Sequence, residues 1–177
     1  MNTEHPPRLV AAASLVIGAL LGMAGTFTPS VPMRGLAWGI DGVLLVVGVA
    51  LLAVHHLRLG QELLAAGFIV FLAGETLIVS GSAMELTASA PTFAAGAGLW
   101  SAGMLLVSAS PAHHVVVRLA GVIGAILFAA TATMIFAGGT LTPLSKPLPF
   151  FAYPFLAVTL FGWAAAHLKR PVHASAA

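Results

Sequence analysis

The stretch LLAAGFIVFLAGETLIVSG, residues 63–81, decides the fold, because it is apolar almost throughout and long enough to cross a bilayer as a helix. One crossing takes about 20 mostly apolar residues. Five further stretches meet this criterion: residues 9–27, 36–54, 92–110, 115–138 and 150–167. The sequence therefore predicts an all-α integral membrane protein, with six transmembrane helices in a single domain over residues 1–177.

The composition of the whole chain supports the same class. The mean hydropathy is +1.04, and only 7% of the residues are charged, whereas soluble domains carry about 25% charged residues. This excludes a soluble enzyme, a nucleic-acid-binding protein and a disordered chain, so the expected partner is the lipid bilayer and not a nucleic acid. No cysteine is present, which excludes disulfides and thiolate sites. No nucleotide-binding or hydrolase motif occurs, so we expect no catalytic residue and no cofactor.

The basic residues predict the orientation. Six helices place both termini on one side, with Arg8, Arg58, Arg118, Lys169 and Arg170, against Arg34 and Lys146 on the other. By the positive-inside rule, both termini face the cytoplasm, and a bacterial inner membrane is the expected location. The first apolar stretch is long for a signal peptide and has no clear cleavage site after it, so we expect it to remain as a helix.

Three similar loops and three similar basic ends indicate a repeated helical hairpin. The expected outer loops read TPSVP from Thr28, TASAP from Thr87 and TPLSKP from Thr142. The three inner ends share histidine and a basic residue, as in AVHHLR from Ala53. We expect three tandem hairpins, approximately residues 9–58, 61–118 and 119–170.

The glycine and proline spacing of the first two hairpins resembles that of the HdeD-type acid-resistance membrane proteins. The residues that carry the resemblance are GALLG at 18–22, Pro29 and Pro32, GVLLVVG at 42–48 and GLWSAGMLL at 98–106. The third hairpin departs from the pattern, because its last helix has only Gly162. The resemblance implies a six-span protein with a role in envelope or acid stress and no catalytic residues.

Glycines at helical spacing predict where helices pack against each other. Gly60, Gly67, Gly74 and Gly81 recur every seven residues, and Gly18 with Gly22 forms a Gly-x-x-x-Gly pair. Membrane helices associate through such small residues. The packing partner could lie in the same chain, in a second copy of a homo-oligomer or in another subunit of a membrane complex.

Two carboxylates, Asp41 and Glu75, lie inside predicted spans, where a charge is costly and ionisable residues usually serve function. Asp41 is six residues from Gly35 and Glu75 is six residues from Gly81, at the outer ends of their spans, which places both roughly 9 Å deep at 1.5 Å per residue. They could therefore share one outward-facing polar site that handles protons or a small solute. Thr76, Ser101 and Tyr153 lie at a comparable depth, as do Trp38, Trp100, Thr131 and Thr133. The alternative is a hydrogen-bonded pair that only fixes the helix register.

Five histidines gather at the expected inner helix ends: His55, His56, His113, His114 and His167. Neutral histidine can ligate metals or haem. Adjacent histidines point in different directions on a helix, however, so they do not form a chelating i,i+4 pair. A ring at the membrane interface is the plainer interpretation.

Three functional hypotheses remain open at this point. The first is an HdeD-like stress protein with proton-linked or small-solute transport through Asp41 and Glu75. The second is a non-catalytic structural or assembly subunit of a membrane complex. The third is a redox module that holds haem or metal on the inner histidines.

Overall fold

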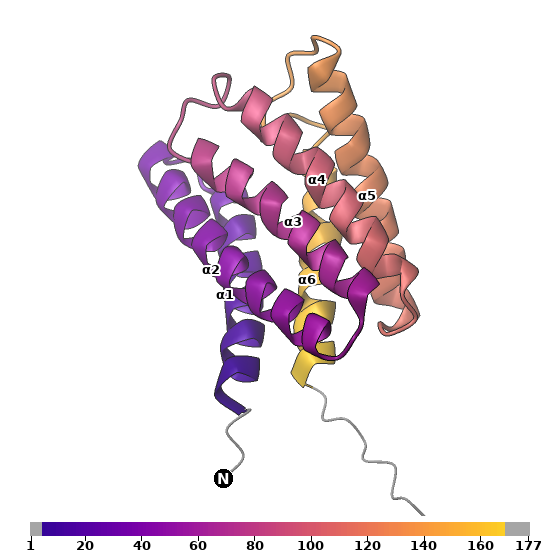
Figure 1. Cartoon of the computed structure of the whole chain (residues 1–177). Coiled ribbons are helices and arrows are strands. Elements are labelled where there is room, and N and C mark those ends of the chain that lie inside the picture. The colour runs from indigo at the N-terminus through magenta and orange to yellow at the C-terminus, as the bar shows by residue number, and fades with distance from the viewer. Residues whose placement is uncertain (1–4, 169–177) are drawn as a thin grey trace, which may run out of the picture.

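The computed structural model describes residues 5–168, and these form a bundle of six long α-helices (Figure 1). The helices are α1 (His5–Phe27), α2 (Val31–Arg58), α3 (Glu62–Gly81), α4 (Ala90–Ala109), α5 (Val115–Phe136) and α6 (Tyr153–Leu168), with a short 3-10 turn η1 (Phe150–Ala152) before α6. All six are long and apolar enough to cross a membrane, when α6 is taken with η1. The prediction of a six-helix integral membrane protein is confirmed.

The helices close into a ring, because each packs against its neighbours in sequence and α6 returns to pack against α1. One apolar core runs through the ring and includes Leu15, Leu45, Phe68, Phe128 and Trp163. Large apolar side chains also point outward, as Leu20, Val43 and Ile126 show. An apolar outer surface of this kind is suited to lipid.

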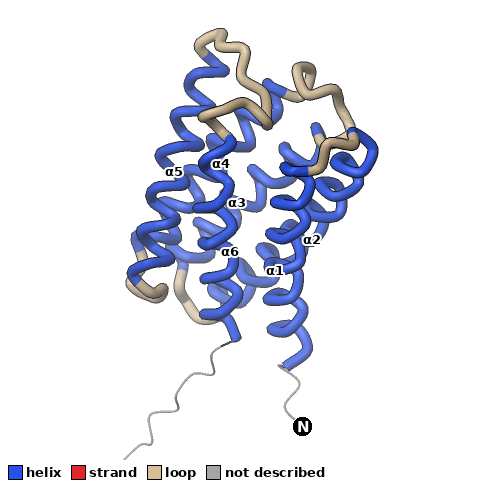
Figure 2. The backbone as a smooth tube through the Cα atoms, turned by 180° about the vertical axis from the view of Figure 1, so that it is seen from behind, coloured by secondary structure: helices blue, strands red, loops and turns tan. Residues whose placement is uncertain are grey.

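The two ends of the bundle differ. The loops 28–30, 82–89 and 137–149 lie at one end, which we term the distal end (Figure 2). Helix α1 begins and α6 ends at the opposite end, termed the terminal end. Lys169 and Arg170, two of the basic residues used to predict orientation, lie outside the described residues.

Two helix boundaries differ from the sequence prediction for physical reasons. Helix α2 begins at Val31 and not at residue 36, because Pro32 occupies its first turn, where a missing N–H removes no hydrogen bond. Gly60 was expected on the glycine stripe of the third span but lies in the turn between α2 and α3. Its φ is +68° and nothing lies within 4 Å of its would-be Cβ, so it makes the turn and packs no helix.

The other glycines of that stripe pack α3 against α4. A Cβ on Gly67 would lie 2.7 Å from Val107, and one on Gly74 would lie 2.7 Å from the backbone oxygen of Gly96. Gly96 and Gly103 face back toward α3 at equally short range. The threefold hairpin repeat stays a prediction, since α2 with α3 and α4 with α5 also pack together and the hairpins do not stand apart.

Candidate functional site

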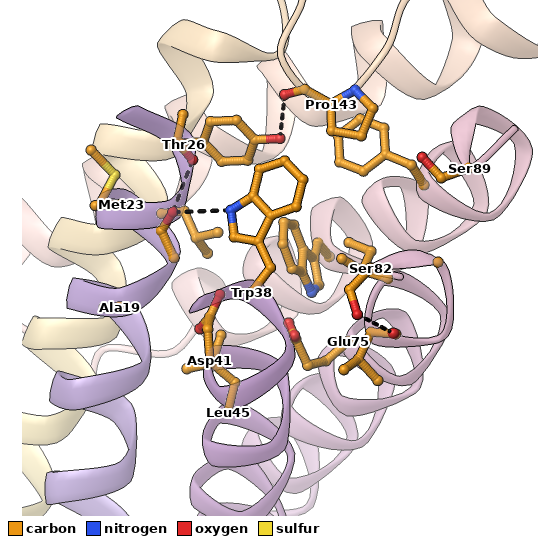
Figure 3. A pocket seen from close by; sticks show the side chains of 18 of the residues that line it. Ala19, Met23, Thr26, Trp38, Asp41, Leu45, Glu75, Ser82, Ser89 and Pro143 are labelled. Atoms are coloured by element: carbon orange, nitrogen blue, oxygen red, sulfur yellow. Dashed lines mark hydrogen bonds between the residues drawn. The ribbon is translucent and has the colours of Figure 1, made fainter. Parts of the chain in front are cut away.

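A cavity with acidic and aromatic walls lies inside the distal half of the bundle (Figure 3). It offers about 80 Å³ to the centres of water molecules, several times the 10–15 Å³ that one water needs. Its walls come from α1, α2, α3, α4, α6 and the distal loops. The polar or aromatic residues that line it are Thr26, Trp38, Asp41, Glu75, Ser82, Ser89, Thr92, Phe93, Trp100 and Tyr153.

Asp41 extends from α2 into a notch on α1. The notch exists because Gly18 and Gly22 carry no side chain: a Cβ on Gly22 would lie 2.5 Å from Asp41 Oδ2, and one on Gly18 would lie 3.3 Å from Asp41 Oδ1. Leu45, one turn further along α2, fills the same notch beside Gly18. The Gly-x-x-x-Gly pair of α1 therefore packs the two helices together and also makes room for a carboxyl group.

Glu75 lies on α3 and is only 2% exposed. Its carboxyl group rests on Gly42 of α2, where a Cβ would lie 3.2 Å from Glu75 Oε1. Gly42 directly follows Asp41 in the chain, so Glu75 packs against α2 beside the residue that carries the other acid, and both acids line the same cavity. Figure 3 shows the two side chains on facing helices at similar depth.

Several polar atoms of this cavity are buried without a hydrogen-bond partner. They are Asp41 Oδ1, Glu75 Oε2 and Trp100 Nε1. The Trp100 indole lies near enough to interact with the Glu75 carboxyl, but the contact lacks the distance and angle of a regular hydrogen bond. Among the described residues that line the cavity, none is Lys, Arg or His. The site therefore has unused acceptors, an unused donor and no positive charge of its own.

Trp38 covers the carboxyl groups on the distal side (Figure 3). Its indole N–H donates to the backbone oxygen of Gly22 at 3.3 Å, the same oxygen that accepts from the Thr26 hydroxyl at 2.9 Å. The guanidinium carbon of Arg34 lies 5.7 Å from the Trp38 ring centre. The Tyr153 hydroxyl donates to the backbone oxygen of Pro143 at 2.8 Å, which ties α6 to the distal loop.

The structure brings together some of the residues predicted from depth and separates others. Asp41, Glu75 and Tyr153 line the cavity, together with Trp38 and Trp100. Thr76 is exposed and its hydroxyl donates to Ala73 O of its own helix. Ser101 and Thr131 are buried but do not line the cavity, and Thr133 is exposed. The glycines that seat the two carboxyl groups were not predicted as part of the site, although Gly42 directly after Asp41 was a visible indication.

A second cavity lies at the terminal end and collects four of the five predicted histidines. Its volume is about 270 Å³, and His55, His56, His113 and His167 line it, together with Arg8 and Gln61. His114 instead caps α5, where its Nδ1 accepts from Val116 N at 3.3 Å. Among the described residues, no group of three or more His, Asp or Glu side chains could hold a metal ion.

A ladder of aromatic rings separates the two cavities. Trp100, in the wall of the distal cavity, stacks on Phe71, and Phe71 meets Trp163 edge to face. Trp163 meets Phe68, which stacks on His56 in the wall of the second cavity. Phe68 and Phe71 are fully buried. The ladder therefore runs from the wall of one cavity to the wall of the other.

Comparison with known proteins found no match: no protein-family model, no curated protein and no solved structure matches the chain. The fold and the site define a class, namely a six-helix integral membrane protein with a buried acidic cavity near one end. Any functional conclusion rests on the residues of that cavity.

Proposed function

We propose that this protein binds a small solute in the distal cavity in exchange for a proton, with Asp41 and Glu75 as the proton-binding groups. A bacterial inner-membrane location with cytoplasmic termini is part of this proposal, and it places the cavity near the outer surface. The acid-stress role implied by the HdeD-type resemblance would draw on the same proton-binding step.

One observation carries the proposal: two carboxyl groups share a cavity whose described lining residues include no Lys, Arg or His, and each carboxyl group keeps a buried oxygen without a partner. A purely structural carboxyl group inside a membrane protein would be expected to complete its hydrogen bonds or pair with a cation, because an unsatisfied buried polar group costs free energy. Intramembrane ionisable residues that face an internal cavity typically lie on proton or ion pathways.

Infrared difference spectroscopy of the purified protein between acidic and alkaline pH tests the proposal. We expect a carboxyl C=O band that appears on acidification, and we expect Asp41→Asn or Glu75→Gln to remove part of it. Thr76→Val is the matched control, since Thr76 neighbours Glu75 in sequence but lies outside the cavity, and its band should equal that of the wild type.

A carboxyl band that does not change with pH, or one that neither variant alters, would contradict the proposal. The pair would then have a constant protonation state and only a structural role, as in an assembly subunit. Thermal unfolding of each variant shows whether a lost band reflects a lost proton site or a lost fold.

A further inference from the structure

The chemistry of the distal cavity selects one class of solute, and this inference rests on the function proposed above. An anion is excluded as the preferred ligand, because the described lining residues supply two carboxyl groups and no basic side chain. A neutral polar solute that entered as the proton left would leave two carboxylates without any compensating positive charge, in a site that is otherwise largely apolar. A cation is therefore the ligand that fits the electrostatics.

The apolar walls narrow the choice among cations. A hard metal ion such as Mg²⁺ or Ca²⁺ takes six or more oxygen ligands, and the described residues that line the cavity supply only two carboxyl groups. Leu45, Phe93, Leu156 and Leu160 line the same cavity and offer hydrocarbon contacts. This combination suits a cation that carries its own apolar groups.

Aromatic rings supply the third requirement. Trp38, Trp100 and Tyr153 line the cavity together with the acids, and aromatic faces attract organic ammonium groups, with tryptophan the most effective. The free N–H of Trp100 lies beside Glu75, where it can hold the orientation of a deprotonated carboxyl group. From this arrangement we propose that the solute is a small organic ammonium ion, bound by Asp41 and Glu75 between the tryptophan rings.

The exchange balances in charge. A pair that holds one proton has a net charge of −1. When the ammonium ion enters and that proton leaves to water, the occupied site again has a net charge of −1. The titratable groups that line the cavity are Asp41 from α2, Glu75 from α3 and Tyr153 from α6, while α1 and α4 contribute none. Arg34 is placed against Trp38, which lines the cavity.

Equilibrium binding of radiolabelled tetramethylammonium to the purified full-length protein tests the proposal, with potassium at equal ionic strength as competitor. We expect saturable binding that potassium does not displace and that weakens as the pH falls. The weakening approaches tenfold per pH unit where one proton is released for each cation bound. Glu75→Gln and Asp41→Asn should each weaken binding tenfold or more, and Trp38→Leu should weaken it severalfold. Thr76→Val should bind as the wild type does.

Equal displacement by potassium, or binding that survives both carboxyl substitutions, would overturn the organic-cation proposal. Its failure is distinguishable from failure of the proposed function. A titrating infrared carboxyl band without tetramethylammonium binding would leave proton binding intact and reject this class of solute. Ammonium binding without a titrating band would instead reject the exchanged proton. A thermal unfolding curve for each variant separates lost binding from lost structure.

Discussion

Glu75 shows how much of the site depends on one residue. It is almost fully buried, keeps one oxygen without a partner and rests on a glycine of the neighbouring helix. Each of these features is unfavourable or neutral for folding, because desolvation of a carboxyl group is not repaid unless its hydrogen bonds are completed. These features fit the proposed function, in which a proton or a solute supplies the missing partner of Glu75.

His113 lies at the terminal end, in the loop between α4 and α5, and like Glu75 it is a buried ionisable residue with unpaired polar atoms. It is 8% exposed, and both of its ring nitrogens are buried without a partner. Burial, and secondarily the charge of the nearby His56, lower the pKa of His113 from 6.5 to about 4. The folded protein therefore holds this imidazole neutral under conditions in which the unfolded chain would protonate it.

His113 predicts an acid-dependent loss of stability. Well above pH 6.5 the imidazole is neutral in both states and has no effect on the pH dependence. As the pH falls from 6.5 toward 4, only the unfolded state gains the proton, so the free energy of unfolding decreases. Between pH 7 and pH 5 the loss is about 2 kcal/mol, reduced by any solvent reaching the ring. His113→Leu should remove this part of the decrease, measured by thermal unfolding in detergent at both pH values.

His114→Asn is the control, because an asparagine keeps a side-chain acceptor at the N-terminus of α5. It should leave the decrease between pH 7 and pH 5 unchanged. If His113→Leu loses as much stability on acidification as the wild type, the imidazole is not held neutral and this interpretation is wrong.

Among the helices, close packing of α1 with α2 and of α2 with α3 forms the places in which the two acids of the distal cavity lie. The notch of α1 that receives Asp41, and Gly42 of α2 that receives Glu75, place each acid against a glycine of the adjacent helix. Close approach through small residues is a general way for membrane helices to associate. In this bundle the same device provides the volume into which the carboxyl groups fit.

Gly22→Ala tests this role of glycine. The added methyl group would lie 2.5 Å from Asp41 Oδ2, so either the carboxyl group or α1 must move. We expect tetramethylammonium binding to weaken tenfold or more and stability to fall by about 1–3 kcal/mol. Gly39→Ala on α2 is the matched control, since nothing lies within 4 Å of its Cβ position. It should bind normally and be equally stable, or more stable by up to about 1 kcal/mol. Equal effects of the two substitutions would contradict the notch.

Residue counting along each apolar stretch was sufficient to predict the six helices, whereas the depth of Asp41 and Glu75 in the membrane stays a prediction. It could not predict which side of a helix faces the cavity, because helix rotation is fixed by packing against neighbours. Thr76 illustrates this: it adjoins Glu75 in depth, but one residue along a helix turns the side chain by about 100°, and it points outward. Pro32 illustrates a different limit, because proline marks a loop or a first helical turn equally well.

In the molecule as a whole, the two ends of the bundle differ in the chemistry of their cavities. The distal cavity is acidic, the terminal cavity holds histidines and Arg8, and the aromatic ladder from Trp100 to His56 lies between them. Phe71 and Trp163, in the middle of this ladder, are both fully buried. The orientation in the membrane therefore determines from which side the acids are reached in this conformation.

The absence of cysteine from the chain allows that orientation to be measured with single cysteines. Ala88 lies in a distal loop and Ala112 in the terminal-end loop between α4 and α5, and both are exposed. Arg8, Arg58 and Arg118 lie at the terminal end, against Arg34 and Lys146 at the distal end, so the positive-inside rule places the distal end outside. In intact bacterial cells with a permeabilised outer membrane, an impermeant maleimide should label Ala88→Cys and spare Ala112→Cys. Both should react equally in detergent, which controls for local reactivity. The opposite labelling pattern would place the acidic cavity on the cytoplasmic side, from which an ammonium ion would then enter.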